Sequence, residues 1–243
     1  ADGHIAWCWD MGGSNATNRS GTITSTVRAN TTYGQSIVSY VGTGSAMTVG
    51  HGLDSTPEMI IIKSRDRAEN WFVYHEATGT GREIFLNNTL ADAPNGNAMT
   101  AVNATTFASS GDTPNRSGDN HIAYCFHSVT GYSKIGSYTG TGSTTTIDTI
   151  GFRPAFVMTK RTDSSGEWRI YDSTRSPNIN KESVTKFLQP DKSDAEKTTG
   201  GGIEFLSNGF KTTSSSADIN ASGGTYIYMA FADNREYAYW LDQ

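Results

Sequence analysis

The sequence predicts an all-β protein made of two tandem antiparallel β-sandwich repeats of about 100 residues each. Two observations predict this fold. Similar stretches recur along the chain at a spacing of 98 residues. The composition of 26 Gly, 58 Ser plus Thr and 16 Asn, with only 18% charged residues, suits many short strands joined by polar turns.

The repeat is clearest at a tyrosine that precedes a glycine-rich turn. Residues 40–45 read Tyr-Val-Gly-Thr-Gly-Ser, and residues 138–143 read Tyr-Thr-Gly-Thr-Gly-Ser. A proline and a continuous apolar run follow in both copies, at 57–63 and 154–160. Such a run is typical of a fully buried central strand, which tolerates proline at its start because no ladder hydrogen bond is lost there. We expect each run to form a hairpin with the next aromatic segment, and about six strands per repeat.

One type of strand occurs three times although there are only two repeat bodies. The copies lie at 4–10, 121–127 and 226–232, and each alternates apolar side chains with a period of two. One terminal copy is therefore surplus. We expect it to pair onto a sheet edge, either bridging the repeats or entering a neighbouring subunit by strand addition. The side chains expected to serve as this assembly strand are Ile5, Trp7 and Trp9 at the start, or Tyr226 and Phe231 near the end.

These boundaries predict how the chain is divided. We expect an N-terminal strand and polar arm at 1–36, a first sandwich at 37–127, a second at 128–234, and at 235–243 a C-terminal extension toward a neighbouring domain. Cys8 and Cys125 occupy equivalent places in two copies of one strand. Their pattern favours small buried apolar positions over a disulfide, and whether they pair stays open.

Charge and hydropathy argue against two classes of partner. The net charge is -5 and no segment carries a Lys/Arg cluster, so we expect no nucleic-acid partner. No run of 18 apolar residues exists, so we expect no membrane insertion.

No motif predicts catalysis, a cofactor or a metal. The Gly-Thr-Gly-Ser runs lack both the phosphate-loop ending and the nucleophile elbow, and they read as turns. His51 and His75 read as lone surface histidines, and the five His show no zinc-site spacing. The carboxylates that could in principle serve a glycosidase lie in polar turns, where we expect them to be solvated: Asp163, Glu167, Asp191, Asp194 and Glu196. We also expect 163–167 to be a hairpin tip rather than a calcium loop.

Aromatic residues offer the alternative of sugar binding. Trp71, Trp168 and Trp240 are candidates for stacking on a glycan, while the recurrence of Trp71 and Trp168 at one repeat position favours core or subunit-interface packing. The seven Asn-x-Ser/Thr sequons are explained mostly by the Ser/Thr content, and they are Asn15, Asn18, Asn30, Asn87, Asn103, Asn115 and Asn220.

Several stretches together resemble a module of marine tailed-phage virion proteins, including those of cyanophages. They are the tyrosine-glycine turn, 151–158 with 160–163, 205–210 and 226–231. In that family the module often lies beside a concanavalin A-like lectin domain, and 235–242 resembles the stretch that leads into it. The resemblance implies a tail-fibre, appendage or head-decoration role, and it carries over no catalytic residue.

The sequence therefore predicts a non-enzymatic virion structural protein located on the particle surface. The expected partners are other virion subunits, including copies of the same chain in a homo-oligomer. A module for host attachment that binds a cell-surface glycan is the alternative.

Overall fold

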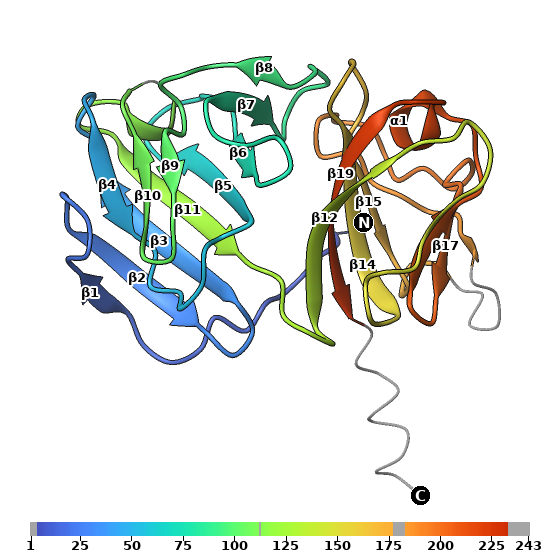
Figure 1. The fold of residues 1–243 in the computed structure, drawn as a ribbon, viewed down its shortest axis with the longest axis horizontal. Helices are drawn as coiled ribbons and strands as arrows, with labels where there is room; N and C mark the ends of the chain where they lie inside the picture. Colours follow the sequence, from blue (N-terminus) through green and yellow to red (C-terminus); the bar gives the residue numbers. More distant parts are fainter. Residues whose placement is uncertain (1–3, 112, 177–182, 233–243) are drawn as a thin grey trace, which may run out of the picture.

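The computed structural model describes residues 4–111, 113–176 and 183–232. The two repeats form two neighbouring bodies, coloured blue to green and yellow to red in Figure 1. Nearly all regular structure in the described part is β-strand, and every pair of neighbouring strands is antiparallel. The prediction of an all-β fold with antiparallel β-sandwiches is confirmed.

The first repeat contains a large and a small sheet. The large sheet runs β1 (Ala16–Asn18), β2 (Ser25–Asn30), β3 (Gln35–Val41), β11 (Asn120–Phe126), β5 (Met59–Ser64), β6 (Phe72–His75), β7 (Arg82–Phe85) and β8 (Ala93–Pro94). The small sheet runs β4 (Met47–Gly50), β10 (Thr106–Ser109) and β9 (Ala101–Val102). A 3-10 turn, η1 (Thr113–Asn115), precedes β11. Within the stretch predicted as a polar arm, β1 and β2 extend the large sheet of the first repeat.

In the described residues, the second repeat has two sheets of four strands. We call the sheet with the longer strands its large sheet, and it runs β12 (Ser133–Thr139), β19 (Thr225–Ala232), β14 (Pro154–Arg161) and β15 (Arg169–Asp172). The other runs β13 (Thr145–Ile147), β18 (Gly209–Thr212), β17 (Ile203–Leu206) and β16 (Ser183–Val184). A single helical turn, α1 (Ala217–Asn220), precedes β19.

The sequence repeat is matched by a repeat of strand order. In both large sheets the strand before the glycine turn pairs with the last strand of the repeat. That last strand pairs on its other side with the apolar strand, which pairs in turn with its hairpin partner. The orders are β3-β11-β5-β6 and β12-β19-β14-β15. The apolar runs are central strands, as predicted, and both hairpins are present. The strands beyond the expected six per repeat include the two-residue pairings β8, β9 and β16.

The four sheets stack as four layers with three apolar layers between them. Each sandwich has its own internal core, and a third cluster joins the two large sheets. We call this third layer the seam. Side chains alternate between layers because successive residues of a strand point to opposite faces. On β11, Ala123 and Cys125 face the core of the first sandwich, whereas Tyr124 and Phe126 face the seam.

The surplus strand copy is the N-terminal one, and it is not a strand. Residues 4–12 have no ladder partner within the chain, so Ile5, Trp7 and Trp9 do not bridge the repeats by strand pairing. Strand addition to a neighbouring subunit stays a prediction. Tyr226 and Phe231 belong to β19, which pairs on both sides. The indoles of Trp7 and Trp9 pack into the seam instead, while Ile5 is exposed. Burying an indole removes more than 100 Å² of apolar surface from water, which outweighs one or two ladder hydrogen bonds.

The two cysteines occupy different environments. Cys125 is buried in the first core, where burial raises the pKa of its thiol to about 12, and Cys8 is exposed. Neither forms a disulfide. The expectation of a buried apolar position therefore holds for Cys125 only, because the segment of Cys8 does not join a sheet.

A buried asparagine locks the glycine turn in each repeat. Asn220 accepts from the Thr141 amide at 2.9 Å, and its Nδ2 donates to the carbonyls of Ser143 and Ser214. Asn115 does the same in the first repeat, accepting from the Thr43 amide at 2.7 Å and donating to Ser45 O at 2.6 Å.

These turns require glycine because the backbone next to each buried asparagine approaches the turn closely. A Cβ on Gly42 would lie 2.2 Å from the carbonyl oxygen of Arg116, and one on Gly140 would lie 2.4 Å from that of Ala221. The next glycine of each turn has a positive φ, 70° at Gly44 and 77° at Gly142. A Gly-x-Gly turn beside a buried asparagine is therefore one structural unit, present in both repeats.

We expect Asn220→Ala to lower the free energy of unfolding by about 2 kcal/mol, because it removes a fully buried side chain that bonds one backbone amide and two carbonyls. Asn15 belongs to another sequon but is exposed, so Asn15→Ala should change stability by less than about 0.5 kcal/mol. Urea unfolding followed by circular dichroism measures both values. Equal effects of the two substitutions would contradict the claim that the hydrogen bonds of Asn220 stabilise the glycine turn.

Candidate functional site

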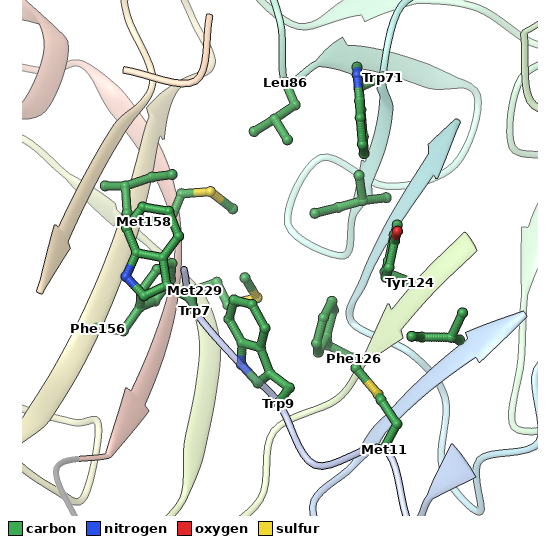
Figure 2. Close-up of a pocket in the computed structure, with 13 residues that line it drawn as sticks. Trp7, Trp9, Met11, Trp71, Leu86, Tyr124, Phe126, Phe156, Met158 and Met229 are labelled. Carbon is green, nitrogen blue, oxygen red and sulfur yellow. The ribbon is translucent and has the colours of Figure 1, made fainter. Parts of the chain in front are cut away.

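The seam contains the candidate site, a cavity of about 370 Å³ between the two large sheets. Figure 2 shows side chains of both repeats pointing toward this common space. The lining is Trp7, Trp9, Met11, Ile37, Ile61, Trp71, Leu86, Tyr124, Phe126, Phe156, Met158, Ile170 and Met229. Every one of these residues is aromatic or aliphatic, so the cavity is built to contact apolar groups.

Strand periodicity explains how distant residues reach the same cavity. Tyr124 on β11 and Met229 on β19 occupy corresponding positions of the repeated strand, and both face the seam. Phe156 and Met158 on β14 approach from the second sheet, opposite Ile61 on β5. The second apolar face of each large sheet therefore supplies the wall.

The N-terminal segment closes one side of the cavity. The indole Nε1 of Trp7 donates to Asp172 Oδ2 at 3.2 Å, and the guanidinium of Arg175 lies 5.7 Å from the Trp7 ring centroid. Trp9 makes edge-to-face contacts with Phe126, on the first sheet, and with Phe156 and Phe231 on the second. Trp9 thus lies between the two repeats (Figure 2).

Two of the three tryptophans proposed for glycan stacking, Trp71 and Trp168, lie in the described part of the chain. Trp168 is only 1% exposed, and its Nε1 donates to the Phe85 carbonyl of the other repeat at 2.9 Å. Its ring is therefore not available for stacking on a glycan and packs in the core of the seam. Trp71 is half-buried at the cavity, and Trp240 lies outside the described residues.

Both histidines expected on the surface are buried. His51 Nδ1 accepts from the Leu53 amide, and its Nε2 lies 3.0 Å from Asn103 O. His75 Nδ1 accepts from the Ala77 amide, which assigns the proton to Nε2, 3.4 Å from the Tyr228 carbonyl of the second repeat. Burial lowers the pKa of His75 to about 4. The expectation of surface histidines is wrong because each ring completes backbone hydrogen bonds that the sequence pattern does not reveal.

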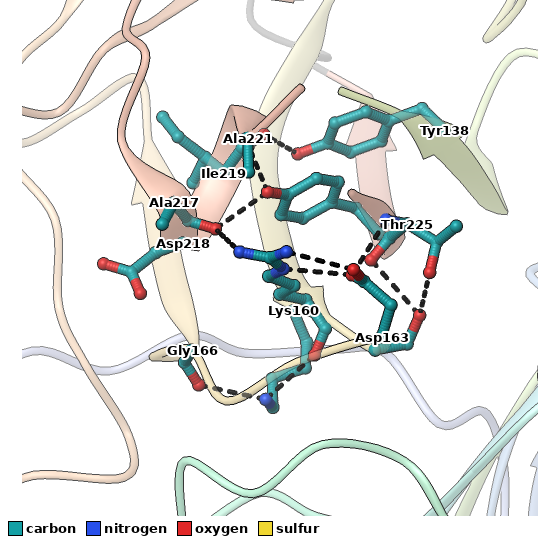
Figure 3. Close-up of polar contacts among 12 residues, drawn as sticks. Tyr138, Lys160, Asp163, Gly166, Ala217, Asp218, Ile219, Ala221 and Thr225 are labelled. Carbon is teal, nitrogen blue, oxygen red and sulfur yellow. Dashed lines mark hydrogen bonds and ion pairs between the residues drawn. The ribbon is translucent and has the colours of Figure 1, made fainter. Parts of the chain in front are cut away.

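Lys160 is a buried functional group that sequence reasoning missed. Its Nζ donates to the carbonyl oxygens of Arg161 and Gly166 at 2.9 Å and of Thr89, in the first repeat, at 3.3 Å. Burial lowers the pKa of this amine to about 8. All three ammonium hydrogens have a carbonyl acceptor, and the bond to Thr89 holds the loop between β14 and β15 against the first repeat. Figure 3 shows the bond from Lys160 to Gly166. The sequence signal for this role is that a lysine ends both apolar runs. Lys63, at the end of the first run, also donates to two backbone carbonyls.

Most of the candidate carboxylates form ion pairs, and Asp163 and Asp194 are also exposed to solvent, as predicted. Asp163 accepts from Arg161 and from the Thr225 amide, and the hydrogen bond from Arg161 lowers its pKa to about 2. Residues 163–167 form the tip of the β14–β15 hairpin, as predicted. The other pairs are Glu167 with Lys192, Asp194 with Lys197, and Glu196 with Arg175 and Lys186. Burial raises the pKa of Asp191, which does not line the seam cavity.

In the part of the chain that the structure describes, no three His, Cys, Asp or Glu side chains cluster as metal ligands. No helix there is both long and apolar enough to cross a bilayer.

A family model described as a domain of unknown function (DUF7483) matches residues 1–235. The chain belongs to this family. No curated protein and no solved structure matches it. Both repeats and the N-terminal segment fall within the family match, so the seam and its cavity lie inside the family domain.

Trp9 tests the contribution of the N-terminal segment to the seam. We expect Trp9→Ala to lower the free energy of unfolding by about 2 kcal/mol, because it removes a large ring from contact with both sheets. Ile5→Ala, four residues away and 41% exposed in the wild type, should change it by less than about 0.5 kcal/mol. Chemical denaturation compares the two, and a neutral Trp9→Ala would show that the segment contributes nothing to the seam.

His75 predicts a loss of stability in acid. Its pKa is about 4 when folded and 6.5 as the reference value, so the unfolded chain takes up the proton first as the pH falls. The contribution of His75 is therefore present above pH 6.5 and is lost as the pH falls toward 4, by about 3 kcal/mol in total. Unfolding should be measured from pH 7 to pH 4 for the wild type and His75→Gln. Because His51 and His121 titrate in both proteins, the difference in slope isolates His75, and identical slopes would contradict the prediction.

Proposed function

We propose that this protein is a non-enzymatic structural module of a phage virion, used in a tail fibre, an appendage or a capsid decoration. The supporting observation is the seam, which joins the two sandwiches through an apolar layer as extensive as either internal core. Tandem domains that meet only through a linker can move independently. A large apolar contact makes the pair a stiff body, which suits a spacer that transmits load or sets a distance.

Polar links between the repeats support the same role. Besides the Trp168 and Lys160 bonds, the Asp92 amide donates to Thr162 O at 2.9 Å, and the Gly166 amide donates to Thr89 O at 2.9 Å. These bonds connect the loop after β7 with the tip of the β14–β15 hairpin. Both bonds help to fix the relative position of the two repeats.

The use of the ionisable groups also favours a structural role. A catalytic acid, base or nucleophile needs a free face toward a substrate. The buried rings of His51 and His75, and the buried amine of Lys160, instead complete hydrogen bonds of their own loops. Burial lowers the pKa of all three groups, and burial at a structural position perturbs pKa values as effectively as a catalytic site does.

The partners we propose are other virion subunits, including copies of this chain. The N-terminal segment is bound within the seam of its own chain, and its strand addition to a neighbouring subunit stays a prediction. Host-glycan binding has weaker support, since Trp168 is buried and Trp71 faces a cavity whose lining offers few partners for sugar hydroxyls.

Location in the particle tests the proposal. Antibodies raised against the purified chain should label purified phage particles at one fixed place in immunogold electron microscopy. Mass spectrometry of the same particles should recover its peptides in a constant ratio to the capsid protein. Absence from washed particles, or shortening of host polysaccharide by the purified chain, would overturn the proposal. A glycan array with Trp71→Ala as the control variant decides the receptor-binding alternative.

A further inference from the structure

The seam cavity is a built space rather than a gap left by loose packing. At one end the sheets are held by polar bonds, including Trp168 Nε1 to Phe85 O and Lys160 Nζ to Thr89 O. At the other end Trp9 packs edge to face against Phe126 and Phe231. Because both ends are fixed, the two walls cannot approach each other to close the space between them.

The lining determines what can occupy this space. Its surface comes almost entirely from apolar side chains, so water inside would find few hydrogen-bond partners. A charged occupant would lose its hydration without gaining a partner, since no Lys, Arg, Asp, Glu or His among the described residues lines the cavity. The volume of about 370 Å³ falls within the range of small-molecule sites.

The rim and the methionines provide entry and adaptability. Trp71, Leu86 and Tyr124 are partly exposed at the cavity, so the space reaches the molecular surface. Met11, Met158 and Met229 line it from three different segments. Methionine side chains are flexible and polarisable, and they are common where a surface must fit apolar molecules of different shape.

We propose that the seam cavity binds a small uncharged hydrophobic molecule, whose aromatic or aliphatic hydrocarbon part inserts between the two large sheets. Binding displaces poorly bonded water and fills contacts that the fixed walls cannot make with each other. The site is independent of the virion role, because it follows from the seam alone.

Methyl NMR of the wild-type chain tests where such a molecule binds. The probe is N-phenyl-1-naphthylamine, an uncharged two-ring fluorophore, added to protein labelled with ¹³C at the methionine methyl groups. The sequence has six Met, of which Met47 and Met99 lie in the first internal core. We expect saturable binding of one probe per chain that shifts the resonances of Met11, Met158 and Met229 and leaves Met47 and Met99 unchanged. No saturable binding, or shifts confined to Met47 and Met99, would overturn the proposal.

A matched pair of variants tests the cavity itself. Leu86 lines the cavity, whereas Leu188 occupies the corresponding position of the second repeat and packs on the seam without lining the cavity. Leu86→Trp should fill part of the space and weaken probe binding at least about tenfold, while Leu188→Trp should change it less than about twofold. Circular dichroism verifies folding of both. Equal weakening by the two variants would contradict the proposal, and if Leu86→Trp does not fold, the NMR result on the wild type decides.

Discussion

Apolar contact between the two large sheets is the constraint on which the rest of the structure depends. The central strands β5 and β14 are buried on both faces, so each large sheet must be covered twice. The small sheet of the same repeat covers one face, and the other repeat covers the second. Neither sandwich could expose its seam face in water without presenting a large apolar patch. The two repeats are therefore separate units of sequence but one unit of stability.

Local patterns predicted the strands better than they predicted what covers them. The apolar runs at 57–63 and 154–160 predicted buried central strands, because a strand covered on both faces has no polar alternation. The alternation at 4–10 predicted a strand, yet a period of two shows only that one side is buried. Residues 4–10 satisfy this condition with Trp7 and Trp9 in the seam and no ladder partner.

Polar residues of the interior were the least predictable part. The sequence did not indicate the buried hydrogen bonds of Asn115, Asn220 and Lys160, because burial of a polar group depends on partners that are distant in sequence. The amide of Thr141, for example, lies 79 residues from Asn220. The sequence signal for these buried polar residues is that the same residue type stands at the same position of both repeats, asparagine in one case and lysine in the other. The cavity had no such signal, since it arises from the spacing of two sheets rather than from any one segment.

The asparagine lock also limits where this chain can be produced. Asn115 and Asn220 are followed by Arg-Ser and Ala-Ser, so a eukaryotic secretory pathway would read both as acceptors for N-linked glycans. Their Nδ2 atoms already donate to carbonyls inside the fold, and both side chains are fully buried. A sugar attached there before folding would occupy the space that the glycine turn must enter. The same short motif that is a harmless turn element in a bacterial cytoplasm would therefore block folding in the endoplasmic reticulum.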